Sequence, residues 1–237
     1  MTAVGVCCPA GPARRVTGRR RLWLVRSGKS RLVRNAQEVE MTVETPKDLQ
    51  GRRVALLVAN EGVEQVELTE PRTALDRAGA TTELLAPRGG SVQAFNHLDK
   101  ADTFDVDAPV SSVGVGDFDA LVLPGGVANA DQLRLDPDAV AFVGEFLRRG
   151  KPVGVICHGP WAMVEADAVR GRTMTSWPSV QTDLRNAGAN WVDEEVVTCE
   201  HGPGVIVSSR KPDDLPAFCR EIVHQFATSG DVAAARK

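Results

Sequence analysis

Cys157 and His158 stand where a short apolar run, Pro152–Ile156, stops on Cys-His-Gly-Pro and a helix-compatible stretch begins. A sharp break from strand to helix exposes its turn residue at a helix N-terminus, where backbone N–H groups and the helix dipole favour a thiolate. Free cysteines are often small buried hydrophobes, but the place of Cys157 between a strand and Gly-Pro favours a nucleophile.

A thiol that attacks a carbonyl group needs a proton acceptor and donors for the oxyanion that develops. Gly125 and Gly126 directly follow another apolar run, so their backbone N–H groups, together with that of His158, predict an oxyanion hole. His158 is the candidate base, although adjacent side chains usually diverge. Asp131, on the same Pro-Gly-Gly loop, would orient the imidazole as the third member of a triad, or act only as a turn residue.

Glu67 lies at the start of a predicted helix and is expected to donate a hydrogen bond, in its protonated form, to the sulfur of Cys157. Glu64, one turn earlier, competes for this role, although a solvated helix face suits it better. His97 falls in a polar loop, for which a surface position is favoured over the site. Cys199 and Cys219 look structural.

Short apolar runs alternate with amphipathic segments from Gly51 onward, which indicates βαβ units and a mostly parallel sheet. The sequence predicts an α/β fold with a mostly parallel central sheet. The expected strands are Arg53–Ala59, Thr82–Ala86, Ala120–Leu123, Pro152–Ile156, Arg172–Thr175 and the pair Val196–Thr198 with Val205–Ser208. The expected helices are Val66–Ala78, Pro137–Arg149, Gly159–Ala168, Ser179–Ala187 and Pro212–Ala227, with loops and short edge strands over 88–118.

Ligands gather beyond the carboxyl ends of the strands in open parallel sheets. The loops Asn60–Glu67, Pro124–Asp131 and Cys157–Trp161 therefore converge on one rim, where we expect the site.

Charge divides the chain of 237 residues into a basic head and an acidic body. Residues 1–40 hold nine Lys/Arg against Glu38 and Glu40, a net charge of +7, whereas residues 41–237 hold 19 basic and 29 acidic residues, a net charge of −10. We expect a basic, disordered extension over 1–50, a single domain over 51–230, and a flexible tail over 231–237.

Several classes of protein are disfavoured. No segment approaches the roughly 20 apolar residues needed to span a bilayer, and the basic head fits weak binding to anionic surfaces at most, so we expect neither a membrane nor a nucleic-acid partner. The five cysteines are odd in number and lack zinc-ligand spacing, which favours the cytoplasm and no metal. Gly114–Asp119 precedes a strand instead of following one, so it predicts no dinucleotide site, and no cofactor is expected.

Four segments together resemble the PfpI family of intracellular proteases and stress proteins, within the class I glutamine amidotransferase-like superfamily and related to the Parkinsonism-associated deglycases. They are Val58–Leu68, Ala120–Gly126, Lys151–Pro160 and Thr175–Gly188. The resemblance spans about residues 51–227 and implies a flavodoxin-like three-layer α/β/α sandwich. It implies that Cys157 is the nucleophile, that Glu67 touches its sulfur, and that the triad acid comes from the Pro-Gly-Gly loop of an adjacent subunit, for which Asp131 is the best match.

The resemblance also implies a homodimer or a larger assembly of dimers. It indicates a cysteine-dependent stress-protection enzyme that acts on small reactive carbonyls or on glycated protein, as a deglycase or glyoxalase, or else as a peptidase. A redox sensor or holdase chaperone that uses the same acidic cysteine is the alternative. A glutamine amidotransferase would need a late histidine followed closely by Glu, which neither His201 nor His224 supplies. A cysteine-type α/β-hydrolase would have Gly two residues before Cys157, and Gly154 lies three before it.

Overall fold

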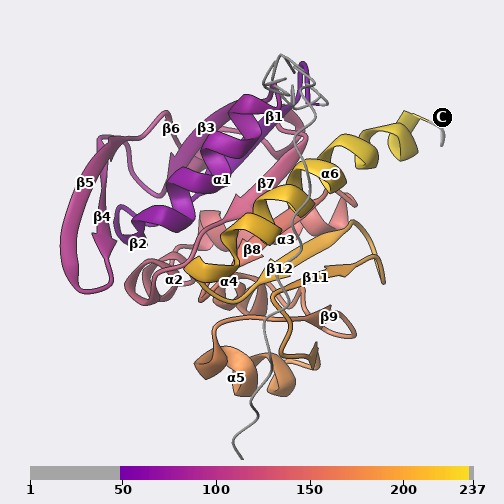
Figure 1. The fold of residues 1–237 in the computed structure, drawn as a ribbon. Coiled ribbons are helices and arrows are strands. Elements are labelled where there is room, and N and C mark those ends of the chain that lie inside the picture. Colours follow the sequence, from indigo (N-terminus) through magenta and orange to yellow (C-terminus); the bar gives the residue numbers. More distant parts are fainter. Residues whose placement is uncertain (1–48, 235–237) are drawn as a thin grey trace, which may run out of the picture. The chain divides into compact units, whose positions relative to one another are not determined.

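The computed structural model describes residues 49–234, and the predicted basic extension lies outside these residues except for its last two positions. A seven-stranded sheet runs through the described part, in the order β11-β12-β8-β7-β1-β3-β6 (Figure 1). Only β11 is antiparallel to its neighbour. The strands are β1 Arg53–Leu57, β3 Thr81–Ala86, β6 Ala108–Pro109, β7 Ala120–Leu123, β8 Val153–Ile156, β11 Val196–Cys199 and β12 Ile206–Ser209. The predicted α/β sandwich with a mostly parallel sheet is confirmed.

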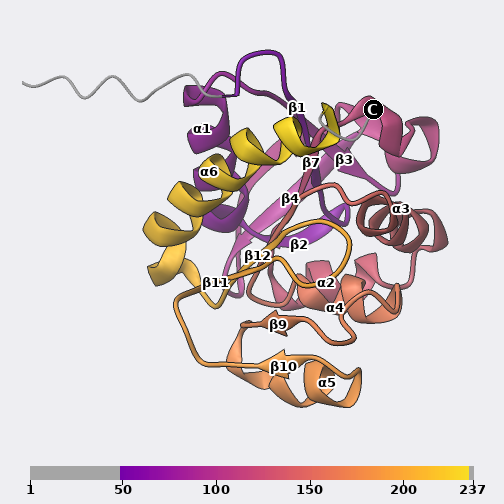
Figure 2. The same ribbon diagram turned by 90° about the vertical axis from the view of Figure 1, so that its right-hand side faces the viewer.

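Helices cover both faces of this sheet (Figure 2). On one face α1 packs against α6, and on the other α3 packs against α4, with α2 beside α4. Their bounds are α1 Gln65–Arg77, α2 Val127–Leu133, α3 Pro137–Arg148, α4 Pro160–Glu165, α5 Gln181–Asn186 and α6 Leu215–Ala234. Short 3₁₀ turns occupy Val110–Ser112, Val115–Asp117, Pro178–Val180 and Pro212–Asp214. Helix α6 extends seven residues past its predicted end at Ala227, into the segment expected as a tail.

Helix α3 begins and ends where its sequence signals predict. The side chain of Asp136 caps the helix by accepting a hydrogen bond from the Ala139 amide at 2.9 Å, and Pro137 occupies the first turn. Gly150 follows the C-terminal end with a φ of +70°. A capping side chain and a terminal glycine satisfy backbone groups that the helix leaves unpaired.

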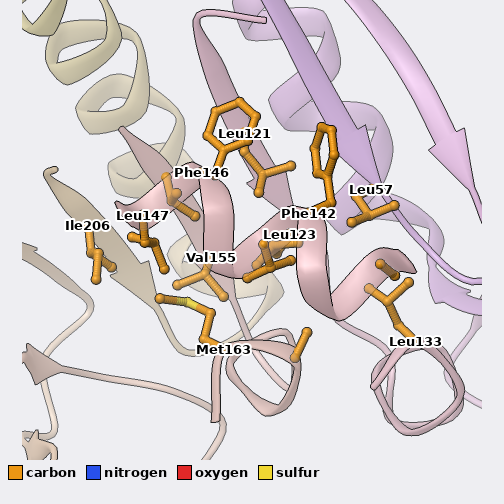
Figure 3. Close-up of a cluster of buried hydrophobic side chains, with 14 of the residues drawn as sticks. Leu57, Leu121, Leu123, Leu133, Phe142, Phe146, Leu147, Val155, Met163 and Ile206 are labelled. Atoms are coloured by element: carbon orange, nitrogen blue, oxygen red, sulfur yellow. The ribbon is translucent and has the colours of Figure 1, made fainter. Parts of the chain in front are cut away.

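The alternating side chains of the central strands fill two separate cores. Leu57, Leu121, Leu123 and Val155 point toward α3 and α4, where they pack with Phe146 and its neighbours (Figure 3). Leu56, Val122 and Ile156 face α1 and α6 on the opposite side. Because both faces are covered, the strands are apolar at nearly every position, and this is why they are legible in the sequence.

Two small sheets accompany the main one, and they contain the predicted strand over 172–175 and the short edge strands expected within 88–118. Strands β2 Glu61–Glu64, β4 Ser91–Asn96 and β5 Asp99–Asp105 form one of them, and β9 Thr173–Met174 pairs with β10 Asn190–Trp191 in the other. The polar sequence of β5 gives no strand signal, because its residues are mostly exposed and owe their conformation to antiparallel pairing with β4. The predicted loop 60–67 therefore contains a strand, and the predicted loop 124–131 contains the start of α2.

Candidate active site

Cys157 occupies a strained turn at the carboxyl end of β8. Its φ of +61° lies in the left-handed region, which costs a non-glycine residue about 1–3 kcal/mol unless the surroundings enforce it. Its backbone is held on both sides: its N–H donates to the Ser209 carbonyl at 3.1 Å, and its carbonyl accepts from the Trp177 amide at 3.0 Å. A Cβ at Gly159 would lie 2.6 Å from the Leu123 carbonyl oxygen, so only glycine permits this sharp entry into α4.

His158 faces the thiol despite being its neighbour in sequence. Its Nδ1 lies 3.2 Å from Sγ of Cys157, and its Nε2 lies 3.4 Å from Oγ of Ser179. The ring stacks on Trp177 at 5.9 Å between centroids and meets the edge of Trp161 at 5.1 Å. Burial lowers the pKa of His158, so the imidazole is neutral and Nδ1 is placed to accept the thiol proton.

Glu67 is fully buried beneath the thiol, on the first turn of α1. Its Oε2 accepts a hydrogen bond from the Gly125 amide at 2.9 Å, whereas its Oε1 has no hydrogen-bond partner within the part of the chain that the structure describes. Burial raises the pKa of Glu67 to about 8, with a further contribution from the charge of Glu64 and an opposing one from the contact with Cys157. Near neutral pH this carboxyl group therefore carries its proton. Donation of that proton to the sulfur stays a prediction.

The resting thiol is less acidic than its place at a helix N-terminus predicts. Burial raises the pKa of Cys157, and the charge of an ionised Glu67 raises it further, against the backbone N–H groups of Gly126 and His158. Cys157 is only 6% exposed. These effects favour a protonated thiol beside a neutral imidazole, whereas the break from strand to helix by itself predicts a thiolate.

The two glycines of the Pro-Gly-Gly turn have different roles. The amides of Gly126 and His158 act on the Cys157 sulfur as donors that lower its pKa, and their role as oxyanion donors stays a prediction. The amide of Gly125 is engaged by Glu67, so its predicted role as an oxyanion donor is wrong. A Cβ at Gly125 would collide with Glu67 and with the β-carbon of Cys157 and lie 3.0 Å from the sulfur. Gly125 therefore allows the acid and the thiol to meet.

Asp131 does not reach His158 within its own chain. It lies on α2 instead of on a loop, and its carboxylate pairs with Arg134 at 2.8 Å. Arg134 in turn covers the face of Trp161 at 4.7 Å from the ring centroid. Among the described residues the group beyond the imidazole is the hydroxyl of Ser179. The sequence places Ser179 within the Thr175–Gly188 segment but does not mark it as a site residue.

Asn129 is a second residue that the sequence analysis missed. Its buried side chain accepts from the Ala59 amide at 2.7 Å and donates to the carbonyls of Pro124 and Gly125 at 3.1 and 2.9 Å. These bonds join the end of β1 to the Pro-Gly-Gly turn after β7. No local pattern marks this residue, because its partners lie up to 70 positions away.

A cavity of about 530 Å³ opens above Cys157. Its wall includes the three carboxyl groups Glu61, Glu64 and Glu67, the apolar groups Phe95, Leu98, Val127 and Trp177, and the histidines His97 and His158. His97, expected on the surface, lies at the turn between β4 and β5 with 86% of its side chain exposed, yet it borders this cavity. Glu64 holds that turn by accepting from the His97 amide at 3.1 Å.

The remaining cysteines of the described region lie apart from this cavity. Cys199 is buried on β11, where its sulfur accepts from the Thr173 amide at 3.4 Å, and Cys219 is partly buried on α6. Between residues 49 and 229, no group of three His, Cys, Asp or Glu side chains is arranged to hold a metal ion. Within residues 49–234, no helix is both long and apolar enough to cross a membrane.

Comparison with known proteins identifies the family. The DJ-1/PfpI family profile matches residues 52–225, which is most of the chain. The chain belongs to the DJ-1/PfpI family. Among DJ-1/PfpI relatives, General stress protein 18 of Bacillus subtilis is 41% identical over 174 residues, covering 72% of this chain and 95% of its own. YraA of the same organism, named as a candidate cysteine protease, is 38% identical over 170 residues, covering 72% and 95%.

Solved structures of DJ-1/PfpI proteins share the fold. DJ-1beta of Drosophila melanogaster superposes with a TM-score of 0.66 at 24% identity, covering 78% of this chain and 96% of its own, which shows the fold alone. A two-domain protein of Anabaena variabilis, with a DJ-1/ThiJ/PfpI-like and a ferritin-like domain, has a TM-score of 0.66 at 32% identity. That match covers 73% of this chain and about half, 49%, of the two-domain protein. The predicted resemblance to PfpI proteins is confirmed.

Proposed function

We propose that this DJ-1/PfpI protein is a cysteine-dependent enzyme of the hydrolase type that acts on reactive carbonyls or early glycation adducts. One observation carries the proposal: Sγ of Cys157 lies 3.2 Å from Nδ1 of a neutral His158, at the floor of a cavity large enough for a small ligand. A thiol within hydrogen-bond reach of a base is the arrangement that nucleophilic catalysis requires.

The reaction begins when His158 takes the thiol proton through Nδ1 as sulfur bonds to the aldehyde carbon. The carbonyl oxygen gains the electron pair, is stabilised by the amides of Gly126 and His158, and accepts a proton to give a hemithioacetal. For a glyoxal, the proton on this carbon then moves to the neighbouring carbonyl carbon, which leaves a thioester of a hydroxy acid. Water cleaves the thioester and restores the thiol, so one water is consumed per turnover.

Peptide hydrolysis is a less favoured use of the same site. It requires His158 to deliver a proton to the nitrogen of an amine leaving group, a demand that attack on an aldehyde does not make. The name of the relative YraA supports a peptidase. Reaction with a small carbonyl compound does not need this proton transfer to an amine, so we rank it above peptide hydrolysis.

Incubation with methylglyoxal tests the proposal by following the appearance of lactate. We expect turnover by the wild type, a loss of at least about 100-fold in Cys157→Ala, and little change in Cys219→Ala, whose thiol lies on α6 away from the cavity. A casein or fluorogenic peptide assay on the same variants measures the peptidase alternative. Equal lactate formation by the wild type and Cys157→Ala would remove the basis for a cysteine enzyme.

A redox sensor or holdase is the second candidate. The unpartnered Oε1 of Glu67 next to the sulfur supports it, because a protonated carboxyl group can hydrogen-bond a sulfinate oxygen. If the protein suppresses aggregation of a client equally well with Ala at position 157 and forms no lactate, a cysteine-independent holdase is the function instead. If the wild type stops suppressing aggregation of the client only after it has been treated with peroxide, the result would indicate a redox sensor.

A further inference from the structure

The charged groups around the cavity share one sign. Glu61, Glu64 and Glu67 all line it, and no lysine or arginine does among the described residues. Burial keeps Glu67 protonated near neutral pH, so the fixed charge belongs to Glu61 and Glu64. Glu61 is exposed on β2 and forms no ion pair or side-chain hydrogen bond within residues 49–229. Its carboxylate is free to meet a ligand.

Glu64, unlike Glu61, is held in place by contacts with the turn between β4 and β5. Its carboxylate accepts from the His97 amide at 3.1 Å and lies 3.8 Å from Nδ1 of His97, with 13% of the side chain exposed. A carboxylate that is partly shielded from water acts on a nearby charge more strongly than one on an open surface. The turn that carries His97 and Leu98 therefore keeps a negative charge at the cavity.

The rest of the wall favours the same kind of ligand. Trp177, 36% exposed, presents an indole ring to the cavity, and Phe95 adds a phenyl ring. Aromatic faces attract ammonium and guanidinium groups. At the floor, the buried Oε1 of Glu67 has no hydrogen-bond partner among the described residues. Because Oε2 accepts from the Gly125 amide, the proton of this carboxyl group is available on Oε1 for an acceptor on the ligand, such as its carbonyl oxygen. The aromatic rings and the unpartnered Oε1 of Glu67 are observations separate from the negative charge of Glu61 and Glu64.

We propose that the cavity selects electrophiles that carry a positive charge, such as a carbonyl adduct next to an ammonium or guanidinium group, and discriminates against anionic ones. This inference rests on the proposed function, in which Cys157 is the reacting atom. It also accounts for product release, since the hydroxy acid formed from a neutral glyoxal is an anion that Glu61 and Glu64 repel.

Two methanethiosulfonate reagents of opposite charge test the selection without any turnover: the trimethylammonium ethyl reagent and the sulfonatoethyl reagent. In either, the Cys157 thiolate attacks the sulfenyl sulfur, a disulfide forms and methanesulfinate leaves. Their rates at Cys157 are measured on the full-length protein at pH 7.5 by mass spectrometry of the peptide that carries this residue. 2-Mercaptoethanol supplies the reference ratio of the two rates for an uncharged thiol.

We expect Cys157 to prefer the cationic reagent about 10-fold more than 2-mercaptoethanol does, and to lose most of this excess in 0.5 M NaCl. Glu61→Gln and Glu64→Gln are each expected to reduce the preference about threefold. Glu194→Gln, which removes an exposed carboxylate away from the cavity, is the matched control and leaves it unchanged. Glutamine at position 64 can still accept from the His97 amide, so its effect reports charge.

A ratio equal to that of 2-mercaptoethanol, or one that Glu194→Gln lowers as much as Glu61→Gln does, would overturn the selection. Failure of the proposed function looks different: both reagents modify Cys157 with the expected charge preference, while neither methylglyoxal nor its arginine adduct is turned over. If turnover occurs, kcat/KM is compared for methylglyoxal and for the anionic aldehyde glyoxylate. A higher kcat/KM for methylglyoxal, and a smaller ratio of the two values in Glu61→Gln, support the selection in catalysis.

Discussion

Cys157 and Glu67 share a buried environment in which two acidic groups cannot both ionise cheaply. The carboxyl group holds its proton up to about pH 8, and the thiol ionises only at higher pH because of burial and that neighbouring charge. The pair therefore enters the reaction with both protons in place, and His158 is the group able to accept one. This assignment leads to predictions that concern single residues.

Replacing Glu67 by Gln is expected to remove a pH dependence of stability. The folded pKa of Glu67 is about 8 against 4.5 in the unfolded chain, so the folded state binds more protons between these values and the free energy of unfolding falls as pH rises from about 4.5 to 8. The shift of about 3.5 pH units at 1.36 kcal/mol each sets a limit of about 5 kcal/mol. Urea unfolding at pH 5, 7 and 8.5 measures this fall. A parallel fall in Glu67→Gln would contradict the assignment.

The same substitution is expected to make the thiol more acidic. Glutamine keeps a hydrogen-bond acceptor for the Gly125 amide but carries no charge, so the contribution that an ionised Glu67 makes to the raised pKa of Cys157 disappears. The rate of iodoacetamide modification of Cys157 as a function of pH should shift to lower pH in Glu67→Gln. A shift to higher pH would mean that the proton of Glu67 stabilises the thiolate more than its charge opposes it.

Gly125→Ala is expected to disrupt the site by steric conflict. The added methyl group would overlap Glu67 and Cys157, and overpacking of this kind costs about 1–3 kcal/mol and displaces both side chains. We expect the rate of Cys157 modification and the rate of lactate formation each to change at least 10-fold. Gly89→Ala is the matched control, because its added Cβ would meet only Pro109, at 3.8 Å. Equal effects of the two substitutions would show that Gly125 has no special place at the site.

Among the secondary-structure elements, the loops that form the site are held by contacts between distant segments. Asn129, at the start of α2, bonds to the backbone after β1 and after β7, and thereby fixes the turn that carries Gly125 and Gly126. Strand β2 and the β4–β5 hairpin form the opposite wall of the cavity. The hairpin is tied to α1 by the reciprocal pair in which Gln65 donates to and accepts from Asp102.

Asn129→Ala is expected to lower the free energy of unfolding by about 3 kcal/mol, because it removes three buried hydrogen bonds and leaves the Ala59 amide and the Pro124 carbonyl without the partner that Asn129 supplies. Asn190→Ala, at an exposed position with one long side-chain bond of 3.3 Å, should change it by less than about 0.5 kcal/mol. Urea denaturation of both variants measures the difference. Similar midpoints would show that the Asn129 bridge does not support the fold.

At the scale of the whole molecule, we propose that the chain forms a homodimer in which Asp131 of one copy serves the other. Asp131 pairs with Arg134 and leaves His158 without a carboxylate in its own chain. Leu98 is 89% exposed and Val127 52%, at the border of the cavity, which is the kind of surface a second copy covers.

Sedimentation equilibrium should give about 51 kDa, twice the chain mass of 25.4 kDa. Asp131→Asn should lower kcat about 10-fold or more without changing this mass, provided that the aspartate orients His158. A species of 25.4 kDa that turns over methylglyoxal at the wild-type rate would exclude the shared site.

The sequence by itself determined the parallel sheet, the helices that flank it and the position of the candidate nucleophile. Strands buried on both faces must be apolar throughout, and α3 has a capping Asp136 and a closing Gly150, so these elements are encoded in adjacent residues. The Cys-His-Gly-Pro sequence, at which an apolar run ends, likewise marks Cys157 through residues adjacent to it. Glu67 followed from its place at the start of α1 and from the family resemblance.

Only the tertiary structure decided the chemistry around the sulfur. The polar strand β5 and the bridging role of Asn129 depend on partners far away in sequence, and no local pattern encodes them. The assignment of Gly125 to Glu67, and the rise in the thiol pKa, follow from burial and from distances between side chains of different segments. A nucleophile can be located by the turn that presents it, but its acidity is set by everything packed around it.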